Sequence, residues 1–256
     1  EAEYVRVVEV DIAGLISELN KLNEWNGVIY VADTSAKVVD NSGTVTNPGT
    51  AAAPTPSFGG STVPDHFNRA IRFKNGATLP TGGMTIVSEN PVYILGDFNT
   101  GGSPPSNSGT YTDPDVSGYV RRNAAIVADA VTVLSGDWND SNSNKSTPQR
   151  DAKNTTVNAA IVAGIVPTTA SAYSGGGENF VRLLEDWSGA HFTYYGSMVQ
   201  LYKSQQARGV WITPGGTVYK SPTRHWFYEP NFSTSSPPGN LQIAAYLQQQ
   251  RWYQVY

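Results

Sequence analysis

Two short segments occur twice in this sequence, and the repetition is the feature that most restricts the fold. Asn123–Ala128 (NAAIVA) returns unchanged as Asn158–Ala163, and Gly96–Asn99 (GDFN) returns as Gly136–Asn139 (GDWN). Each copy lies at the start or end of a short apolar run. Self-similarity spaced by a few tens of residues is typical of architectures in which similar units stack on one another.

Short apolar runs separated by Gly, Asn, Asp or Pro predict many short β-strands. The predicted strands are Val5–Val10, Val28–Val31, Ile71–Phe73, Met84–Val87, Val92–Leu95, Ala124–Ala128, Val131–Leu134, Val157–Val166, Phe180–Leu184, Phe192–Tyr195 and Met198–Tyr202. Strands of this length suit a sandwich, a barrel or a solenoid. The repeats favour the solenoid, because each unit of a solenoid contacts only its neighbours and loops can leave without disturbing the stack. We therefore expect an all-β fold, a right-handed parallel β-helix, with a β-sandwich as the alternative.

A single domain with three parts is expected. Its N-terminal part, residues 1–26, would hold a strand and a capping helix, since Asp11–Leu22 has apolar residues on one helical face and Asp11 suits the N-cap. The β-helix core would be residues 27–240, with polar, Gly- and Pro-rich loops at 41–64, 100–118 and 139–153. Residues 241–256 would be a C-terminal cap or flanking segment.

Composition excludes several classes of function. Charged residues are sparse and the formal net charge is −4, so a nucleic-acid surface, which needs clustered Lys and Arg, is not expected. The absence of Cys removes disulfides, thiol nucleophiles and Cys-bound metals. No apolar run approaches the roughly 20 residues of a membrane span. The abrupt start at Glu1, without a visible signal peptide, predicts a trimmed or mature fragment whose anchor lies upstream.

Several segments resemble a domain at the C-terminus of bacterial pilus-assembly proteins of the PilX type, and they cover most of the chain from about Gly27. These segments are Gly27–Asp33, Glu89–Asn99, Ala124–Ser135, Gly176–Phe180, Leu183–Trp187, Tyr195–Val199 and Pro237–Gly239. The family is related to type IV pilus machinery and carries an N-terminal membrane helix before a large exported domain. The resemblance implies a β-helical domain on the cell surface or on a filament. It supplies no catalytic residues.

Motifs for enzyme chemistry are scarce. His66, His191 and His225 are far apart and lack zinc-binding spacing; no serine-hydrolase elbow or phosphate loop occurs. Asp97 and Asp137 end equivalent repeats, and two carboxylates within about 5–10 Å can act as acid and base on a glycoside. The sequence favours a plainer role for both as turn residues, because Asp and Asn bond to nearby backbone in turns.

Two further groups are candidate ligand sites. Aromatic side chains that would stack on sugar rings are Trp138, Tyr194, Tyr195 and Trp211. Oxygen ligands gather at Asp137, Asn139 and Asp140, a pattern that resembles part of a calcium loop. The segment lacks the central Gly and the distal Glu of an EF-hand. A flexible polar loop is therefore favoured, with calcium as the alternative and no other cofactor expected.

The leading hypothesis is a non-enzymatic structural or adhesive domain, extracellular or on the surface of a bacterium. Its partners would be proteins of a surface or filament assembly. The alternative is a polysaccharide-active enzyme, a glycoside hydrolase or a polysaccharide lyase, or else a carbohydrate-binding module on the same scaffold. Polysaccharide would then be the partner.

Overall fold

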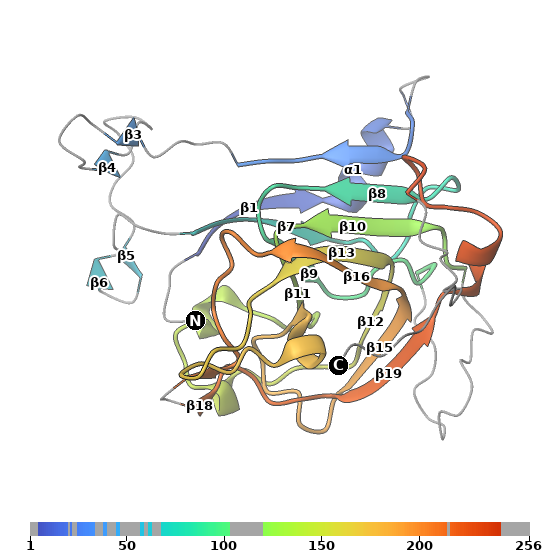
Figure 1. Ribbon diagram of the computed structural model, residues 1–256. Helices are drawn as coiled ribbons and strands as arrows, with labels where there is room; N and C mark the ends of the chain where they lie inside the picture. The colour runs from blue at the N-terminus through green and yellow to red at the C-terminus, as the bar shows by residue number, and fades with distance from the viewer. Residues whose placement is uncertain are drawn as a thin grey trace, which may run out of the picture.

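The structure is a computed structural model that describes residues 5–19, 21, 25–33, 38–39, 45–46, 57–58, 61–62, 68–102, 120–213 and 216–241. It is mostly β, with parallel sheets and little helix (Figure 1). Across the described residues there is one α-helix, α1 (Ile12–Leu19). No helix in this part of the chain is long and apolar enough to cross a bilayer.

Three parallel sheets contain most of the strands. Sheet I has the order β1 (Val5–Asp11), β7 (Asn68–Lys74), β9 (Val92–Leu95), β11 (Val131–Leu134), β14 (Val181–Arg182). Sheet II has the order β16 (Met198–Lys203), β13 (Ala160–Ile165), β10 (Ala124–Ala128), β8 (Met84–Val87), β2 (Val28–Tyr30). Sheet III has the order β12 (Thr155–Asn158), β15 (His191–Gly196), β19 (Thr223–Tyr228).

Short elements complete the described structure. Antiparallel pairs of two-residue strands are β3 (Val38–Val39) with β4 (Val45–Thr46), β5 (Ser57–Phe58) with β6 (Ser61–Thr62), and β17 (Ile212–Thr213) with β18 (Gly216–Thr217). The 3₁₀ turns are η1 (Asp140–Asn142), η2 (Thr147–Gln149), η3 (Gly176–Asn179) and η4 (Pro230–Ser233). Within each parallel sheet the strands stand in chain order, and from β11 to β16 the chain visits sheets I, III and II twice in that sequence.

The first sequence repeat forms two neighbouring strands in matched register. Strand β10 pairs with β13 so that Ile126 lies opposite Ile161 and Val127 opposite Val162.

The second repeat lies at the ends of two neighbouring strands but is one residue out of register, because Leu95 pairs with Leu134 and Gly96 therefore comes opposite Ser135. A Cβ on Gly96 would still lie 3.6 Å from the Gly136 Cα. The first repeat thus occupies equivalent positions in adjacent strands, and the second lies at neighbouring strand ends.

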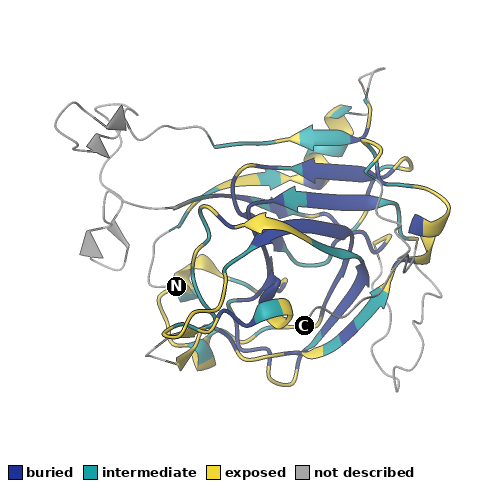
Figure 2. Cartoon of the chain, viewed as in Figure 1, coloured by how far each residue is buried: buried dark blue, intermediate teal, exposed yellow. Residues whose placement is uncertain are grey.

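Buried side chains from all three sheets form one apolar cluster in the space between the sheets (Figure 2). Alternate residues of each strand supply it. Members include Phe73, Ile94, Val133 and Val181 from sheet I, Met84, Ile86, Ile126 and Ile161 from sheet II, and Val157, Phe192 and Tyr194 from sheet III. Burying each large apolar side chain contributes about 1.5–3 kcal/mol, so this shared core is what holds the sheets together.

The helix near the N-terminus is confirmed, although it is shorter than the predicted Asp11–Leu22. The Asp11 Oδ1 accepts the Gly14 N–H at 3.1 Å, as an N-cap does. Ile12 is fully buried in the shared core. Strand β1, which the domain prediction placed with the helix in residues 1–26, pairs with β7 along its whole length and is part of sheet I.

Several β segments differ from the prediction in their bounds or were not predicted, and the two largest differences are a split strand and a missed one. The predicted strand Val157–Val166 is two strands, β12 and β13, which belong to different sheets. The corner is held by reciprocal bonds: Asn158 Nδ2 donates to the Asn99 carbonyl at 2.8 Å, and Asn99 Nδ2 to the Asn158 carbonyl at 2.7 Å. Strand β19 was not predicted, because Arg224 and His225 interrupt its apolar residues.

The structure describes the three predicted loops and the predicted C-terminal cap to different extents. Residues 139–153 leave sheet I and contain η1 and η2. The 41–64 segment holds the short strands β4 to β6. The loop at 100–118 beyond residue 102, and the predicted C-terminal cap at 241–256 beyond residue 241, lie outside the described residues.

Candidate functional site

A row of side chains crosses the outer face of sheet I, one from each strand. Pairing in register places Glu9 beside Arg72, Arg72 beside Tyr93, Tyr93 beside Thr132, and Thr132 beside Arg182. The row therefore runs across the strands from β1 to β14. A polar network lies at the β1 end, and a hollow lies at the β14 end.

The hollow lies where two loops that leave the sheets approach this face. One loop follows β13 and includes Asn179, and the other follows β16 and includes Ala207–Trp211. We call such loops excursions. Its lining is Tyr93, Thr132, Asn179, Arg182, Leu183, Leu184, Ala207, Gly209, Val210, Trp211, Val218 and Tyr219. Its volume is about 20 Å³, which is room for about one water molecule. We call it the aromatic hollow. Among these lining residues Arg182 is the one charged side chain.

Two aromatic rings of the lining stack on each other, and a third ring outside the lining packs against them. We call the three rings the aromatic wall. Trp211 stacks on Tyr219 with ring centroids 5.6 Å apart and an angle of 27° between planes. Tyr173, which is exposed, lies against Trp211 at 5.9 Å. The indole Nε1 of Trp211 is buried and has no hydrogen-bond partner within the part of the chain that the structure describes. A buried donor without a partner costs free energy.

The excursions are fixed to the sheet by backbone contacts. Arg182 Nη2 donates to the Ala207 carbonyl at 2.6 Å, and Nη1 lies 3.4 Å from the Gly209 carbonyl. Gly175, at φ +86, packs so closely that a Cβ there would lie 2.6 Å from Asn179 Cβ and 3.1 Å from Trp211 Cε3. Only glycine fits this left-handed, crowded position. The wall is therefore positioned by rigid contacts to sheet I.

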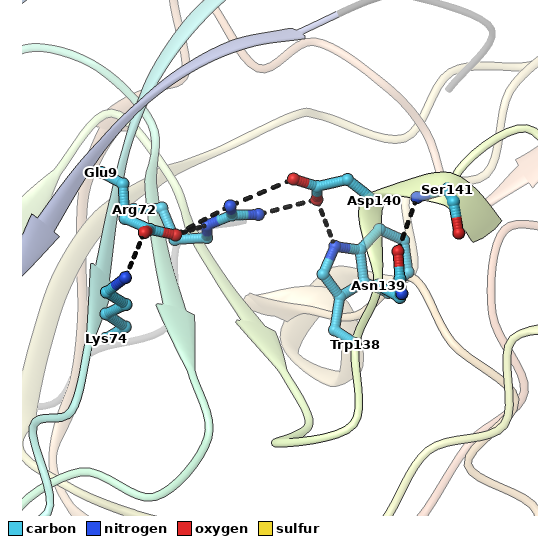
Figure 3. A network of polar contacts seen from close by, with 7 residues as sticks. All are labelled: Glu9, Arg72, Lys74, Trp138, Asn139, Asp140 and Ser141. Atoms are coloured by element: carbon cyan, nitrogen blue, oxygen red, sulfur yellow. Dashed lines mark hydrogen bonds and ion pairs between the residues drawn. The ribbon is translucent and has the colours of Figure 1, made fainter. Parts of the chain in front are cut away.

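The network at the other end of the row fastens the 139–153 excursion to sheet I (Figure 3). Arg72 forms a two-pronged pair with Asp140, at 2.7 and 3.1 Å, and also donates to Glu9 at 2.9 Å. Asp140 accepts the Trp138 indole N–H at 2.8 Å. The Arg72 guanidinium holds the pKa of Asp140 below its ordinary value, and the hydrogen bond from Lys74 does the same for Glu9.

The two candidate catalytic carboxylates have separate partners. Asp97 is half-buried, its Oδ1 accepts the Thr156 N–H at 2.7 Å, and burial raises its pKa. Asp137 is exposed and forms an ion pair with Lys153. The repeats diverge here because Phe98, after Asp97, bridges to Val157 of β12, whereas the chain after Asp137 forms η1 and η2. Asp97 thus fastens β12, a neighbouring strand, and not its own turn.

The three residues predicted to bind calcium already form hydrogen bonds or ion pairs with other protein groups. Asn139 Oδ1 accepts the Ser141 N–H at 2.9 Å as the cap of η1. Asp140 binds Arg72 and Trp138, and Asp137 binds Lys153. Over the described ranges no group of three or more His, Asp or Glu side chains converges as a metal site would. Calcium stays an untested prediction.

The four predicted sugar-stacking aromatics lie in different environments. Trp211 lines the aromatic hollow. Trp138 is half-buried on the same outer face of sheet I, where it packs against the cluster of Ala70, Tyr93 and Leu134. Tyr194 is a core residue whose hydroxyl donates to the Ala159 and Ser197 carbonyls. Tyr195 is 1% exposed, beneath Arg121 at 4.8 Å. The exposure that the prediction required is absent at Tyr194 and Tyr195, because their strand lies deep in sheet III.

The structure brings two distant histidines together. His191 on β15 and His225 on β19 stack with centroids 5.1 Å apart, and His191 Nδ1 lies 2.8 Å from His225 Nε2. Burial and the neighbouring His191 lower the pKa of His225. Their separation in sequence hides this contact, which depends on the pairing of two strands that the sequence did not predict as neighbours.

Comparison of the chain with protein families, with curated proteins and with solved structures gave no match.

Proposed function

We propose that the three parallel sheets are the faces of a right-handed parallel β-helix, with α1 as its N-terminal cap. The chain-order stacking of strands within each sheet supports this proposal, and so does the single core shared by all three sheets. Right-handedness follows the general rule for crossovers between parallel strands. Ile12 supports the capping role, because it brings α1 into contact with the core at the β1 end.

On this scaffold we propose a non-enzymatic structural or adhesive domain, extracellular or on the surface of a bacterium. Its partners would be proteins of a pilus-like or other surface assembly. The observation that carries the proposal is the chemistry of the aromatic hollow. Its lining holds aromatic rings and one guanidinium but no carboxylate, while Asp97 and Asp137 each bind a different partner. Rings without a carboxylate pair suit binding better than glycoside hydrolysis.

An adhesion assay tests this proposal. Beads that carry the protein are passed over layers of bacterial cells, immobilised surface proteins and immobilised polysaccharides, beside beads that carry albumin. We expect saturable retention of the protein-coated beads on at least one layer, with competition by free protein. In parallel, the protein is incubated with a polysaccharide panel and the release of reducing or unsaturated ends is measured. Turnover that is lost in Asp97→Asn or Asp137→Asn would overturn the proposal in favour of an enzyme.

A second candidate, a carbohydrate-binding module on the same scaffold, is favoured by one observation. The rings of Tyr173, Trp211 and Tyr219 pack together beside the hollow, and Tyr173 is exposed. Exposed aromatic rings are a common means by which proteins hold sugars.

A further inference from the structure

We propose that His191 and His225 form a pH-sensitive switch, which holds strand β19 to strand β15 and releases it in acid. We call these two residues the histidine pair. The contact between them survives one added proton and is broken by a second, which must go onto Nε2 of His225. The proposal rests on the position of the two imidazoles, on the way their nitrogens meet and on what β19 is attached to. It does not depend on the binding function proposed above.

Strand pairing places both histidines on the outer face of sheet III, where β15 and β19 run side by side (Figure 1). His191 stands opposite Thr223, and Thr193 stands opposite His225. Phe192, which follows His191, belongs to the shared core, so His191 and Thr193 point outward. The two histidines are therefore diagonal neighbours on one face, a spacing that long side chains can bridge.

The two imidazoles approach each other through their nitrogens. Nδ1 of His191 lies 2.8 Å from Nε2 of His225, and the ring planes differ by 13°. At this distance one nitrogen carries a proton and the other offers a lone pair. We assign His191 as the donor, because His225 is the more deeply buried of the two, at 9% exposure, and burial disfavours a charged ring.

This contact limits the number of protons that the histidine pair can hold. In the neutral pair, Nδ1 of His191 donates to Nε2 of His225. One added proton can go onto Nε2 of His191 and leaves the contact intact. A second has to go onto the accepting nitrogen of His225, so that two N–H groups face each other on adjacent cations. Burial and the charge of His191 lower the pKa of His225, which agrees with this order of uptake.

Charged groups against sheet III are held by other partners. The titratable and charged side chains on the strands and turns around the pair are Asp97, Arg121, Lys153, Tyr195, Arg224 and Glu229. Asp97 accepts the Thr156 N–H. Arg121, which lies over the Tyr195 ring, pairs with Glu229, and Lys153 pairs with Asp137. The Arg224 guanidinium lies 5.3 Å from the Trp226 ring centroid, and its Nη2 donates to the Glu178 carbonyl at 3.3 Å.

Strand β19 connects the histidine pair to another face of the molecule. It is the last strand of sheet III, paired with β15. Glu229 follows it directly and forms the buried ion pair with Arg121. Beyond Glu229, Phe232 packs against Ala125 and Ala160 on the outer face of sheet II. Release of β19 would therefore loosen the segment that covers these two alanines.

Nitrogen NMR of the isotope-labelled full chain tests the proton count directly. At pH 7.5 we expect a proton on Nδ1 of His191, a lone pair on Nε2 of His225, and a coupling between the two nitrogens across the hydrogen bond. On acidification the coupling should vanish in the same step in which Nε2 of His225 gains its proton. The reverse assignment, protons on both nitrogens at pH 7.5, or a coupling that persists after both protons are bound would each overturn the proposal.

Amide hydrogen exchange measures the release of β19. The N–H groups of Thr223 and Glu229 donate to neighbouring carbonyls at 3.0 and 3.3 Å, and they report on the two ends of the strand. Because the folded state disfavours the second proton, opening becomes easier as pH falls below the ordinary His value of 6.5. Protection relative to the intrinsic rate should fall by up to about tenfold per pH unit, the limit for one proton. Val92 in sheet I, whose N–H donates to a carbonyl at 2.8 Å, should keep its protection.

His225→Gln separates the switch from general effects of acid. The Gln side chain places an amide oxygen near the position of Nε2, where it can accept from His191 but cannot take up a proton. Protection at Thr223 and Glu229 should then be the same at pH 5 as at pH 7.5. Asp97→Asn is the matched control and should retain the wild-type loss of protection. Burial raises the pKa of Asp97, so its titration strengthens the fold as pH falls, the opposite sign to His225.

The exchange data decide against the proposal in two cases. One is wild-type protection at Thr223 and Glu229 that does not change between pH 7.5 and pH 5. The other is a folded His225→Gln protein that loses protection in acid as the wild type does. Circular dichroism verifies the fold of each variant, and if His225→Gln does not fold, the nitrogen NMR of the wild type decides alone. Adhesion of protein-coated beads enters neither measurement, so the function proposed above stands or fails separately.

Discussion

Glu185 is a carboxylic acid inside the protein. The residue is 1% exposed, and its carboxylate accepts the Ser135 N–H at 2.7 Å and the Ser135 hydroxyl at 2.6 Å. Burial raises its pKa, an effect that the two Ser135 bonds only partly offset. The folded protein therefore binds this proton more tightly than the unfolded chain does.

The pH dependence of stability should report this group. Because the pKa is raised on folding, its contribution is fully present below the unfolded value of about 4.5 and is lost as pH rises through the folded value. We expect the unfolding free energy of the wild type, relative to Glu185→Gln, to fall as pH rises across this window. Urea unfolding from pH 4 to pH 8 measures it. A difference that rises with pH would contradict the assignment.

Arg121 and Glu229 form a buried ion pair. Their side chains are 8% and 3% exposed, and Arg121 Nε lies 2.5 Å from Glu229 Oε2. Arg121→Met should lower the unfolding free energy by about 3–5 kcal/mol, because it leaves a buried carboxylate without its cation. Adding Glu229→Gln should recover part of this loss, since the amide oxygen can still accept the Asn231 N–H. Denaturant unfolding of the two single variants and the double variant tests the coupling; simple additivity would contradict it.

At the scale of elements, Asp129 fastens the start of the excursion that carries the aromatic wall. Its two oxygens accept three successive backbone N–H groups, from Gln205 at 2.5 Å, Gln206 at 3.1 Å and Ala207 at 2.9 Å. Ala207 is also the residue whose carbonyl binds Arg182. The turn between β10 and β11 thus positions one side of the aromatic hollow.

Removing this carboxylate should loosen the wall. Asp129→Ala should cost about 1–3 kcal/mol of unfolding free energy, since it takes the acceptor from these amides. It should also speed amide hydrogen exchange at residues 205–207 and lower the affinity of the hollow for any ligand. Gln205→Ala, which removes only an exposed bond to the Lys203 carbonyl, is the control. Unchanged exchange at 205–207 in Asp129→Ala would show that Asp129 does not hold the excursion.

Strand positions could be predicted where local pattern decides them. Met84–Val87, Val92–Leu95, Ala124–Ala128 and Val131–Leu134 are strands with the predicted bounds, because each is a β-branched or apolar run closed by turn residues. The corner at Ala159 was missed, since apolar residues continue on both sides of it. Asn158, which holds the corner, is a polar residue within that run, but a single polar residue does not distinguish a corner from a continuous strand.

The site was less predictable than the strands. Trp211 was named as a candidate, but its neighbours were not: Tyr93, Thr132 and Arg182 meet only through the register of three strands, and Tyr219 lies beyond a separate hairpin. The match between Asp97 and Asp137 was misleading for the opposite reason. Their local sequences agree, yet the chain bridges to β12 at Phe98 after Asp97 and forms η1 and η2 after Asp137, and this gives the two carboxylates different partners.

At the scale of the whole molecule, the candidate site lies on the outer face of sheet I. Its row from Glu9 to Arg182 is fixed at both ends, by the Arg72–Asp140 pair and by the Arg182 contacts to the excursion. The shared core makes these sheets a rigid base, while the excursions provide the chemistry. This division predicts that changes in the excursions alter binding more than they alter stability.

The central claim is that the two copies of the first repeat stand beside one another in parallel, matched register, and cysteine cross-linking tests it most directly. The chain has no native Cys. Val127 lies opposite Val162, and Val162 opposite Val199, so Val127→Cys/Val162→Cys and Val162→Cys/Val199→Cys should each join under mild oxidation. Val127→Cys/Val199→Cys should not, because two strand spacings of about 4.8 Å exceed the reach of a disulfide. Mass spectrometry of the folded monomer reads the result. A link between positions 127 and 199, with none between 127 and 162, would contradict the stacked arrangement.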